Sequence, residues 1–230
     1  MSVLLVVAHP DDEVLGAGGL AASATAEGVS VRACMLSGEV EARQGRPALD
    51  RLRADIEAAG AVLGLGPPIL GRFPNIALNT VPHLELVQFV EQAILDTGAT
   101  TIVTHHPGDL NDDHLHVARA TLAAARLFQR RSGVPALERL LYMEVLSSTE
   151  WADGSGGGRF EPTMHVPLTM EQVERKIEAL ACYQGVMRPA PHPRSPEALR
   201  ALATLRGAQA GSLFAESFQV VFSRFTPGGC

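Results

Sequence analysis

The chain has 230 residues, of which 46% are hydrophobic and 19% charged, and its formal net charge is −6. This length allows one domain with a sizeable core, and the composition excludes general disorder. The acidic balance, without runs of Lys or Arg, argues against broad binding to nucleic acid or to an anionic membrane. We therefore expect a globular protein whose partner is a small molecule.

The cysteines and the N-terminal segment indicate the compartment. Cys34, Cys182 and Cys230 are an odd number without CxxC spacing, which favours reduced thiols over a disulfide framework or a thiolate zinc site. The apolar run at the N-terminus is shorter than a signal peptide, and no segment approaches the length of a membrane span. We expect a cytoplasmic protein with no membrane span.

The hydrophobic pattern alternates between strand and helix along the chain. Strands are expected at 3–8, 29–36, 69–70, 100–104, 140–146 and 218–222, and helices at 14–24, 48–63, 82–95, 114–131, 170–183 and 196–207. Glycines early in the first helix predict close packing of that helix on a strand. The alternation predicts a Rossmann-like, doubly wound α/β fold with a mostly parallel sheet. We expect one domain over 1–230, with a parallel core at 1–150 and elements at 151–230 that close a pocket.

Two charged turns follow predicted buried strands. The first is His9-Pro10-Asp11-Asp12-Glu13, directly after the strand at 3–8, and the second runs from His105 to His114, after the strand at 100–104. Ligands of doubly wound sheets bind outside the carboxyl ends of the strands. Because both turns lie at such ends, we expect them at the same edge of the sheet.

The residue types in these turns indicate a metal site. His9 and Asp12 are three residues apart, so both can reach one ion if a helix begins inside the motif, and His114 can supply a third ligand. Two imidazoles and one carboxylate leave zinc an open position for water, as in catalytic sites, and nitrogen ligands argue against magnesium. Zinc lowers the pKa of bound water to roughly 7, and Asp11 is placed to accept its proton.

Each turn alone also has a simpler interpretation. The acidic residues of the first turn could complement a helix N-terminus, and the second turn could be a solvated loop. Their coincidence at two strand ends favours the metal interpretation. Asp113 could cap its helix or orient a metal ligand, and His106 is a reserve ligand. His83, His116 and His165 lack acidic neighbours at ligand spacing and are expected to be surface or core residues.

Two later segments could contribute to the site. The Gly-rich run from Asp153 to Arg159 is predicted to be a flexible surface loop, with a lid over the site as the alternative. The Pro-rich segment at 188–195 is expected to be extended and stiff. It would present His192 and Arg194 at a fixed position.

Five segments together resemble the PIG-L/LmbE family of zinc-dependent N-deacetylases, namely AHPDDEVLGAGG, HHPGDLNDDH, SSTEW, HPRSPEAL and RGAQAGSLFAESF. The resemblance runs nearly from end to end. It implies a Rossmann-like fold, zinc held by His9, Asp12 and His114, and Asp11 as general base. It also implies hydrolysis of an N-acyl group, usually acetyl on an amino sugar, and a homo-oligomer.

The chain departs from this family at two places. Many relatives have, at the position of Asn111, a histidine that steadies the tetrahedral intermediate. Asparagine can donate a hydrogen bond but cannot become cationic, so we expect His192 to take the oxyanion role and Arg194 to bind substrate. Asn75 and Asn79 replace acidic residues that relatives commonly carry. The groups expected around the ligands or the substrate are Asp109, Asp113, Asn111, Arg194 and His106.

The sequence therefore predicts a zinc-dependent hydrolase that removes an N-acetyl group from an amino sugar or its conjugate. One alternative is an amidase of the same family that acts on a thiol-sugar conjugate or a specialised-metabolite amide. Another is a non-catalytic zinc- or sugar-binding homologue, against which the presence of Asp11 speaks. A nucleotide-binding module is disfavoured, because Gly16-Ala17-Gly18-Gly19 is not GxGxxG and the acidic turn would repel phosphate.

Overall fold

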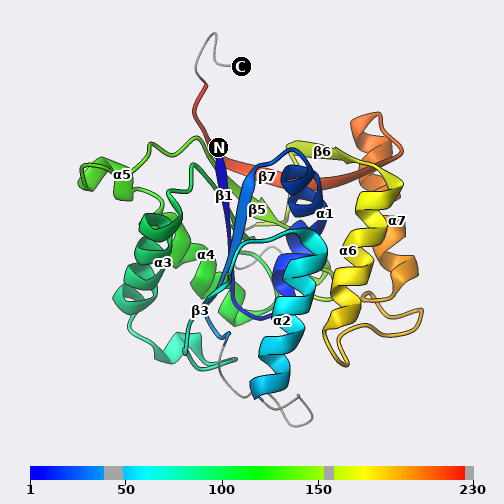
Figure 1. Cartoon of the computed structure of the whole chain (residues 1–230), viewed down its shortest axis with the longest axis horizontal. Coiled ribbons are helices and arrows are strands. Elements are labelled where there is room, and N and C mark those ends of the chain that lie inside the picture. Colours follow the sequence, from blue (N-terminus) through cyan, green and yellow to red (C-terminus); the bar gives the residue numbers. More distant parts are fainter. Residues whose placement is uncertain (39–48, 153–157, 226–230) are drawn as a thin grey trace.

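The computed structural model describes residues 1–38, 49–152 and 158–225, which form one seven-stranded sheet with helices on both faces (Figure 1). The strands are β1 (Ser2–Val7), β2 (Ser30–Met35), β3 (Ile69–Leu70), β4 (Thr101–His105), β5 (Arg139–Met143), β6 (Met164–Leu168) and β7 (Phe214–Ser223). The helices are α1 (Asp12–Ala26), α2 (Leu49–Leu63), α3 (His83–Thr97), α4 (Asp112–Ala124), α5 (Leu127–Arg130), α6 (Met170–Cys182) and α7 (Pro196–Ala210), with 3-10 turns η1 (Leu78–Thr80) and η2 (Thr149–Trp151).

Strand β1 lies in the middle of the sheet, which has the order β3-β2-β1-β4-β5-β7-β6. All side chains from Val3 to Val7 are fully buried. Alternate residues contribute to opposite faces, with Leu5 in one hydrophobic cluster and Leu4 in the other. An uninterrupted apolar run is typical of a parallel strand covered on both faces. The five strands from β3 to β5 are parallel, which confirms the predicted mostly parallel sheet.

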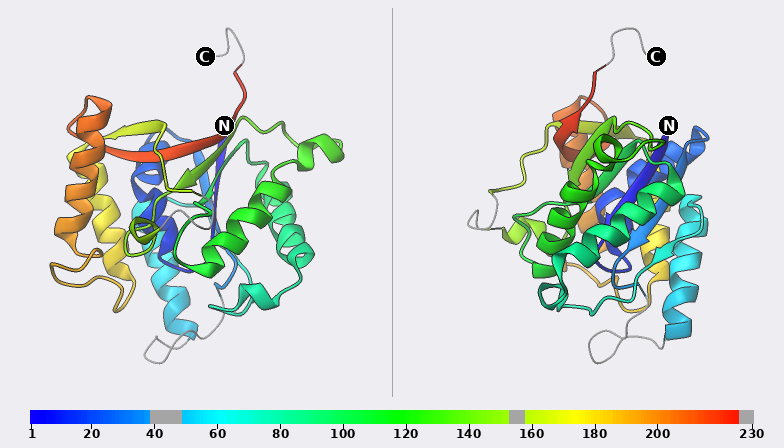
Figure 2. Two further views of the ribbon diagram at one scale, coloured as in Figure 1. Left: turned by 180° about the vertical axis from the view of Figure 1, so that it is seen from behind. Right: turned by 90° about the vertical axis from the view of Figure 1, so that its left-hand side faces the viewer.

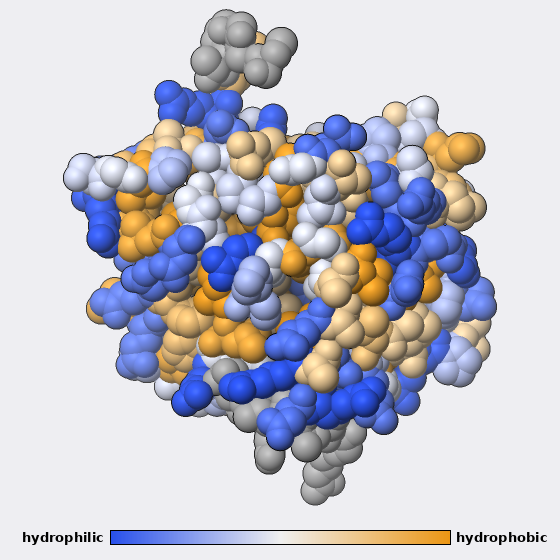
Figure 3. Space-filling model, viewed as in Figure 1, coloured by the Kyte–Doolittle hydropathy of each residue, from blue (hydrophilic) through white to orange (hydrophobic). Residues whose placement is uncertain are grey.

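The helices form a layer on each face of the sheet. Helices α1, α2 and α6 pack on one face through residues such as Leu15, Ile56 and Ile177. Helices α3 and α4 pack on the other, through residues such as Val90 and Val117 (Figures 1 and 2). On the surface seen in Figure 3, hydrophobic patches are interrupted by hydrophilic residues. No helix among the described residues is both long enough and apolar enough to cross a membrane.

Helix α1 packs tightly on the sheet through its glycines. A Cβ atom at Gly16 would lie 2.4 Å from Sδ of Met143 in β5, and one at Gly19 would lie 2.5 Å from the side chain of Leu168 in β6. Both distances are below van der Waals contact, so a larger residue would push the helix away from the sheet. The predicted close packing of this helix is confirmed. This packing holds the N-terminus of α1 near the carboxyl end of β1.

A buried ion pair supports α1 where the helix is interrupted. Ala17 has a non-helical φ of −145°. Glu216 of β7 accepts hydrogen bonds from the backbone N–H groups of Gly19, at 3.1 Å, and Leu20, at 2.6 Å. Lys176 of α6 donates to Glu216 at 2.6 Å. The carboxylate therefore acts as a cap for the second half of the helix, whose first N–H groups lack helical partners.

The C-terminal edge of the sheet differs from the sequence prediction. Strand β7 is longer than the predicted 218–222 and runs antiparallel to both β5 and β6. Strand β6 is missed by the sequence pattern, because it is a partly exposed edge strand that contains Pro167. The predicted helix at 114–131 is divided into α4 and α5. Residues 153–157 of the Gly-rich run at 153–159, for which a lid is the alternative role, lie outside the described residues.

Candidate metal centre and pocket

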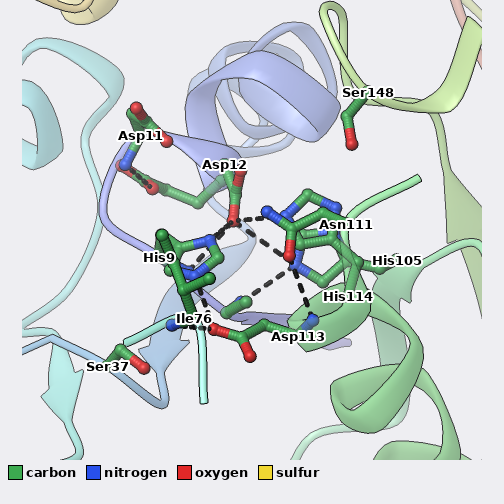
Figure 4. Close-up of polar contacts among 12 residues, drawn as sticks. His9, Asp11, Asp12, Ser37, Ile76, His105, Asn111, Asp113, His114 and Ser148 are labelled. Atoms are coloured by element: carbon green, nitrogen blue, oxygen red, sulfur yellow. Dashed lines mark hydrogen bonds and ion pairs between the residues drawn. The ribbon is translucent and has the colours of Figure 1, made fainter. Parts of the chain in front are cut away.

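His9, Asp12 and His114 meet at the carboxyl ends of the neighbouring strands β1 and β4 (Figure 4). One ligand atom from each of the three buried residues lies within 4.8 Å of the other two. Asp12 Oδ2 is 3.2 Å from His9 Nδ1 and 3.3 Å from His114 Nε2. The structure thus brings together the three residues that the sequence proposes as ligands, from turns about a hundred residues apart.

The turn after β1 is shaped by an unusual backbone conformation at Asp11. Its φ of 107° lies in the region that favours glycine, and such strain in a residue with a Cβ atom often marks a functional site. Asp12 is the first residue of α1, and His9 N donates to Asp12 Oδ2 at 3.0 Å. Glu13 accepts from Asp11 N at 3.1 Å and from the Tyr183 hydroxyl at 2.5 Å. These contacts hold the turn while Asp11 stands apart from the ligand cluster (Figure 4).

Asp113 orients His9. Its Oδ2 lies 3.0 Å from His9 Nε2, the ring nitrogen that faces away from Asp12. The same carboxylate accepts from the backbone N–H groups of Ile76, at 2.6 Å, and Leu78, at 3.0 Å. The alternative role of Asp113 as a helix cap is wrong, because Asn111 caps α4 and accepts from Asp113 N at 3.0 Å. A carboxylate in this position fixes the ring of a metal-binding histidine.

Asp109 has the same relationship to His114. Its Oδ2 lies 3.2 Å from His114 Nδ1, and it accepts hydrogen bonds from Ser148 Oγ and, at 2.6 Å, from Thr149 Oγ1. Burial opposes the charge of Asp109, but His114 and the two hydroxyl groups outweigh it and lower the pKa of the carboxyl to about 2. Each imidazole of the cluster is therefore oriented by its own ionised carboxylate.

The charges around the cluster favour the protonated form of both imidazoles. Burial favours neutral His114, but Asp12 and Asp109 raise its pKa to about 10. Burial likewise opposes the charge of His9, whose pKa is raised by its bonds to Asp113 and Asp12. Both ring nitrogens of His114 are buried without a well-aligned hydrogen bond among the described residues. A cation between Asp12 and the two imidazoles would take the place of these protons.

A third imidazole, His105, adjoins the cluster and was not singled out by the sequence. Its ring stacks on His114 with 3.7 Å between centroids and an interplanar angle of 15°. Its Nε2 accepts from Ala8 N at 2.9 Å, so this nitrogen is not free to bind an ion. Burial and the charge of His114 lower the pKa of His105 to about 3. His105 is the last residue of β4, which ends at the site, and this position in the sequence could have identified it.

His106 is not placed to act as a ligand, which corrects its interpretation as a reserve ligand. Its ring lies edge-on to Tyr142 and Phe160, with centroids 5.6 and 5.8 Å away, and its Nδ1 accepts from Gly108 N at 3.0 Å. Adjacent residues of an extended chain point to opposite sides, so only one of His105 and His106 can face the cluster.

An open pocket of about 590 Å³ lies over the cluster. Its walls include Asp11 and Asn111 from the N-terminal part and His192 and Arg194 from the Pro-rich segment. Arg194 Nη1 is 3.2 Å from Asp11 Oδ2, and Arg194 Nε donates to Ser147 Oγ at 2.8 Å. His192 is exposed, and its Nδ1 accepts from Arg194 N at 3.0 Å. Two segments that are distant in sequence therefore face one pocket.

Several solved structures share this fold. The conserved protein TT1542 from Thermus thermophilus is 26% identical, with a TM-score of 0.76 over 99% of this chain and 98% of that one. N,N'-diacetylchitobiose deacetylase from Pyrococcus horikoshii is 17% identical, with a TM-score of 0.75 over 99% of this chain and 87% of that one.

A third similar structure is named a hydratase, not a deacetylase. GalB, the 4-carboxy-2-hydroxymuconate hydratase from Pseudomonas putida KT2440, is 20% identical, with a TM-score of 0.76 over 100% of this chain and 99% of that one.

No curated protein sequence matches the chain. Residues 4–125, more than half of the chain, match the family model described as GlcNAc-PI de-N-acetylase. The protein therefore belongs to the PIG-L family of GlcNAc-PI de-N-acetylases.

Proposed function

We propose that this protein is a zinc-dependent hydrolase that removes an N-acetyl group from an amino sugar or an amino-sugar conjugate. The observation that supports this most is the position of Asp11, a second carboxylate in the same pocket as the cluster of His9, Asp12 and His114. Binding a cation needs only the cluster. Metal-assisted hydrolysis needs, in addition, a base beside it.

The residues present fit zinc. His9, Asp12 and His114 offer two nitrogens and one oxygen. His114 Nε2, which lies 3.3 Å from Asp12 Oδ2 without a well-aligned hydrogen bond, is the nitrogen of that ring that a cation would engage. Such a donor set suits zinc better than magnesium and leaves a position open. When bound, zinc supplies Lewis acidity that polarises an acyl carbonyl and lowers the pKa of water.

The remaining roles belong to side chains of the pocket. Asp11 takes a proton from the attacking water and returns it to the departing amine, as the C–N bond breaks to give acetate and a free amino group. His192 donates a hydrogen bond to the oxyanion of the tetrahedral intermediate. Arg194 holds the Asp11 carboxylate and contacts substrate. Asn111 can add an amide N–H, because its Oδ1 is already used to cap α4.

The substrate proposal takes support from the family and from the names of similar structures, which include a chitobiose deacetylase and the teicoplanin deacetylase Orf2. The hydratase GalB shares this fold and is named for another reaction, so the pocket residues and not the fold carry the proposed reaction. Another amide, such as a thiol-sugar conjugate, is the alternative within the family. We further propose that the chain is one domain in a cytoplasmic homo-oligomer, with residues after 150 closing the pocket.

One experiment tests the proposal. Purified protein is analysed for zinc and then incubated with a panel of N-acetylated amino sugars, with and without a chelator, while free amine is measured. We expect about one zinc per chain, amine release that the chelator abolishes, and recovery when zinc is returned. Stoichiometric zinc without amine release would contradict the proposed substrate class. Failure to bind zinc on reconstitution would contradict the proposed chemistry.

A further inference from the structure

Asp11, the proposed base, has a backbone conformation that a residue with a Cβ atom disfavours. Its φ of 107° and ψ of −28° lie beyond the small left-handed region that aspartate visits. A conformation of this kind persists only where the surrounding structure enforces it. The groups that enforce it therefore decide where the carboxylate of Asp11 lies in the pocket.

Glu13 provides one such contact from the first turn of α1. Its Oε2 accepts a hydrogen bond from Asp11 N at 3.1 Å, so the helix reaches back to the residue that precedes it. Glu13 is 1% exposed, and a buried carboxyl group needs hydrogen-bond partners. It does not belong to the cluster of His9, Asp12 and His114 that could hold a metal ion. The position of Glu13 is therefore explained by its contact with the backbone of Asp11 and not by metal binding.

Tyr183 supplies the second partner of Glu13. Its hydroxyl group donates to Glu13 Oε1 at 2.5 Å, from a position 170 residues later in the sequence. Tyr183 is 2% exposed, and neither residue is among those that line the pocket over the metal cluster. The hydroxyl group is therefore placed to act on that pocket through Glu13 rather than by contact with a substrate.

Helices α6 and α2 fix the position of Tyr183. The tyrosine directly follows α6, and its backbone N donates to Leu180 O at 3.1 Å. The next residue, Gln184, donates its N–H to Asp55 Oδ2 of α2 at 3.1 Å. Asp55 is itself buried, and its other oxygen lies 2.9 Å from Arg51 Nε. Tyr183 is thus anchored on the helices that pack on the same face of the sheet as α1.

We infer that Tyr183 and Glu13 are positioning residues that hold Asp11 in the orientation required of the base. This inference rests on the proposed function and deepens it. The contacts run from the Tyr183 hydroxyl through the Glu13 carboxyl group to Asp11 N, and so they restrain the backbone of the base. Arg194 contacts the same residue at its carboxylate, 3.2 Å from Oδ2. The backbone and the side chain of Asp11 are therefore held by different segments of the chain.

The first test separates positioning from binding. Tyr183→Phe removes the hydroxyl group and keeps the ring in the core. We expect kcat for amine release to fall by about tenfold, because a displaced base slows the chemical step, while KM and zinc content stay those of wild type. Glu13→Asp keeps the carboxyl group but shortens the side chain, and it should show a similar loss. Tyr142→Phe changes the only other tyrosine, which does not line the pocket, and should keep wild-type kinetics.

The route through Asp11 is tested by combining variants. If Tyr183 acts through the base, Tyr183→Phe should lower the residual turnover of Asp11→Asn by less than about twofold. A further loss of about tenfold in the double variant would show that the hydroxyl group acts by another route, and it would overturn the inference.

A second measurement does not depend on turnover. NMR on isotope-labelled protein measures how fast the backbone N–H of Asp11 exchanges with solvent. We expect exchange about tenfold faster in Tyr183→Phe than in wild type or Tyr142→Phe, because Glu13 is then less restrained as the acceptor. Thermal melting shows whether each variant is folded.

The outcomes distinguish the inference from the proposed function. Equal Asp11 exchange and equal kcat in folded wild type and Tyr183→Phe would overturn the inference, as would a loss confined to KM or to zinc binding. Absence of amine release with every substrate, while Asp11 exchange still depends on Tyr183, would contradict the proposed function alone.

Discussion

Arg194 and Asp11 are 183 positions apart in the sequence, yet Arg194 Nη1 lies 3.2 Å from Asp11 Oδ2. The Asp11 side chain is only 2% exposed, whereas Arg194 is 25% exposed and faces the pocket. A buried carboxylate requires a partner for its charge. This contact therefore joins the Pro-rich segment to the turn after β1 and sets the direction in which the proposed base points.

Replacing Arg194 should impair turnover more than folding. Arg194→Ala removes both the contact with Asp11 and the bond to Ser147, so the Asp11 carboxylate loses one of the groups that orient it. We expect kcat/KM to fall by about 10- to 100-fold, as for other small displacements of catalytic groups. Arg194→Lys should recover part of the loss, because lysine keeps the positive charge but lacks the planar, forked N–H donors of the guanidinium group. Arg131→Ala, at an exposed residue after α5, is the control and should have wild-type kinetics.

Asp113 should control metal affinity through His9. Asp113→Asn removes the charge that orients the His9 ring at 3.0 Å. Loss of such a carboxylate typically lowers metal affinity by about 10- to 100-fold, and we expect the same here. Competition with a chromophoric chelator measures it. The neighbouring Asp112→Asn is a matched control, because Asp112 is 59% exposed and contacts His116. Equal affinities for the two variants would contradict the assigned role.

Asp109 should affect both metal affinity and stability. It orients His114, and it also anchors Ser148 and Thr149 to the turn after β4. We expect Asp109→Asn to weaken zinc binding by about tenfold and to lower the melting temperature of the metal-free protein. Thr149→Ser keeps the hydroxyl and should bind zinc as wild type does. A normal melting temperature for Asp109→Asn would show that the hydroxyl contacts contribute little.

The ion pair behind α1 should be a strong determinant of stability. Glu216→Gln leaves the ammonium group of Lys176 without its partner, at a position where that side chain is only 12% exposed. We expect unfolding free energy in urea to fall by about 3–5 kcal/mol, as when one partner of a buried pair is removed. Glu174→Gln disrupts an exposed pair with Arg200 and should cost less than about 1 kcal/mol. Similar losses for the two variants would be inconsistent with capping of α1 by Glu216.

Local patterns in the sequence were sufficient for the centre of the fold and for the three proposed ligands. The strand at 3–8 is an unbroken apolar run, and the two turns that carry His9, Asp12 and His114 follow strands whose ends must meet in a parallel sheet. Strand β6 was not predicted. As an edge strand it does not need alternating buried and exposed residues, and Pro167 interrupts its strand pattern.

Contacts between distant segments could not be predicted in the same way. Asp113 is next to His114 in the sequence but orients His9, which is 104 positions away. His105 and His106 are adjacent, and the direction of each side chain depends on the register of β4, which the residue pattern does not specify. Ile76 has a left-handed φ of 58° and donates its backbone N–H to Asp113, and neither feature can be read from the residue pattern.

The most direct test of the proposed mechanism compares Asp11→Asn with Asp12→Asn. Both variants are analysed for bound zinc and for amine release from the substrate preferred by wild type. The account predicts that Asp11→Asn keeps about one zinc per chain while turnover falls by about 100-fold or more, because only the base is lost. Asp12→Asn should lose zinc and activity together. Normal turnover in zinc-loaded Asp11→Asn would contradict the assignment of Asp11 as the base.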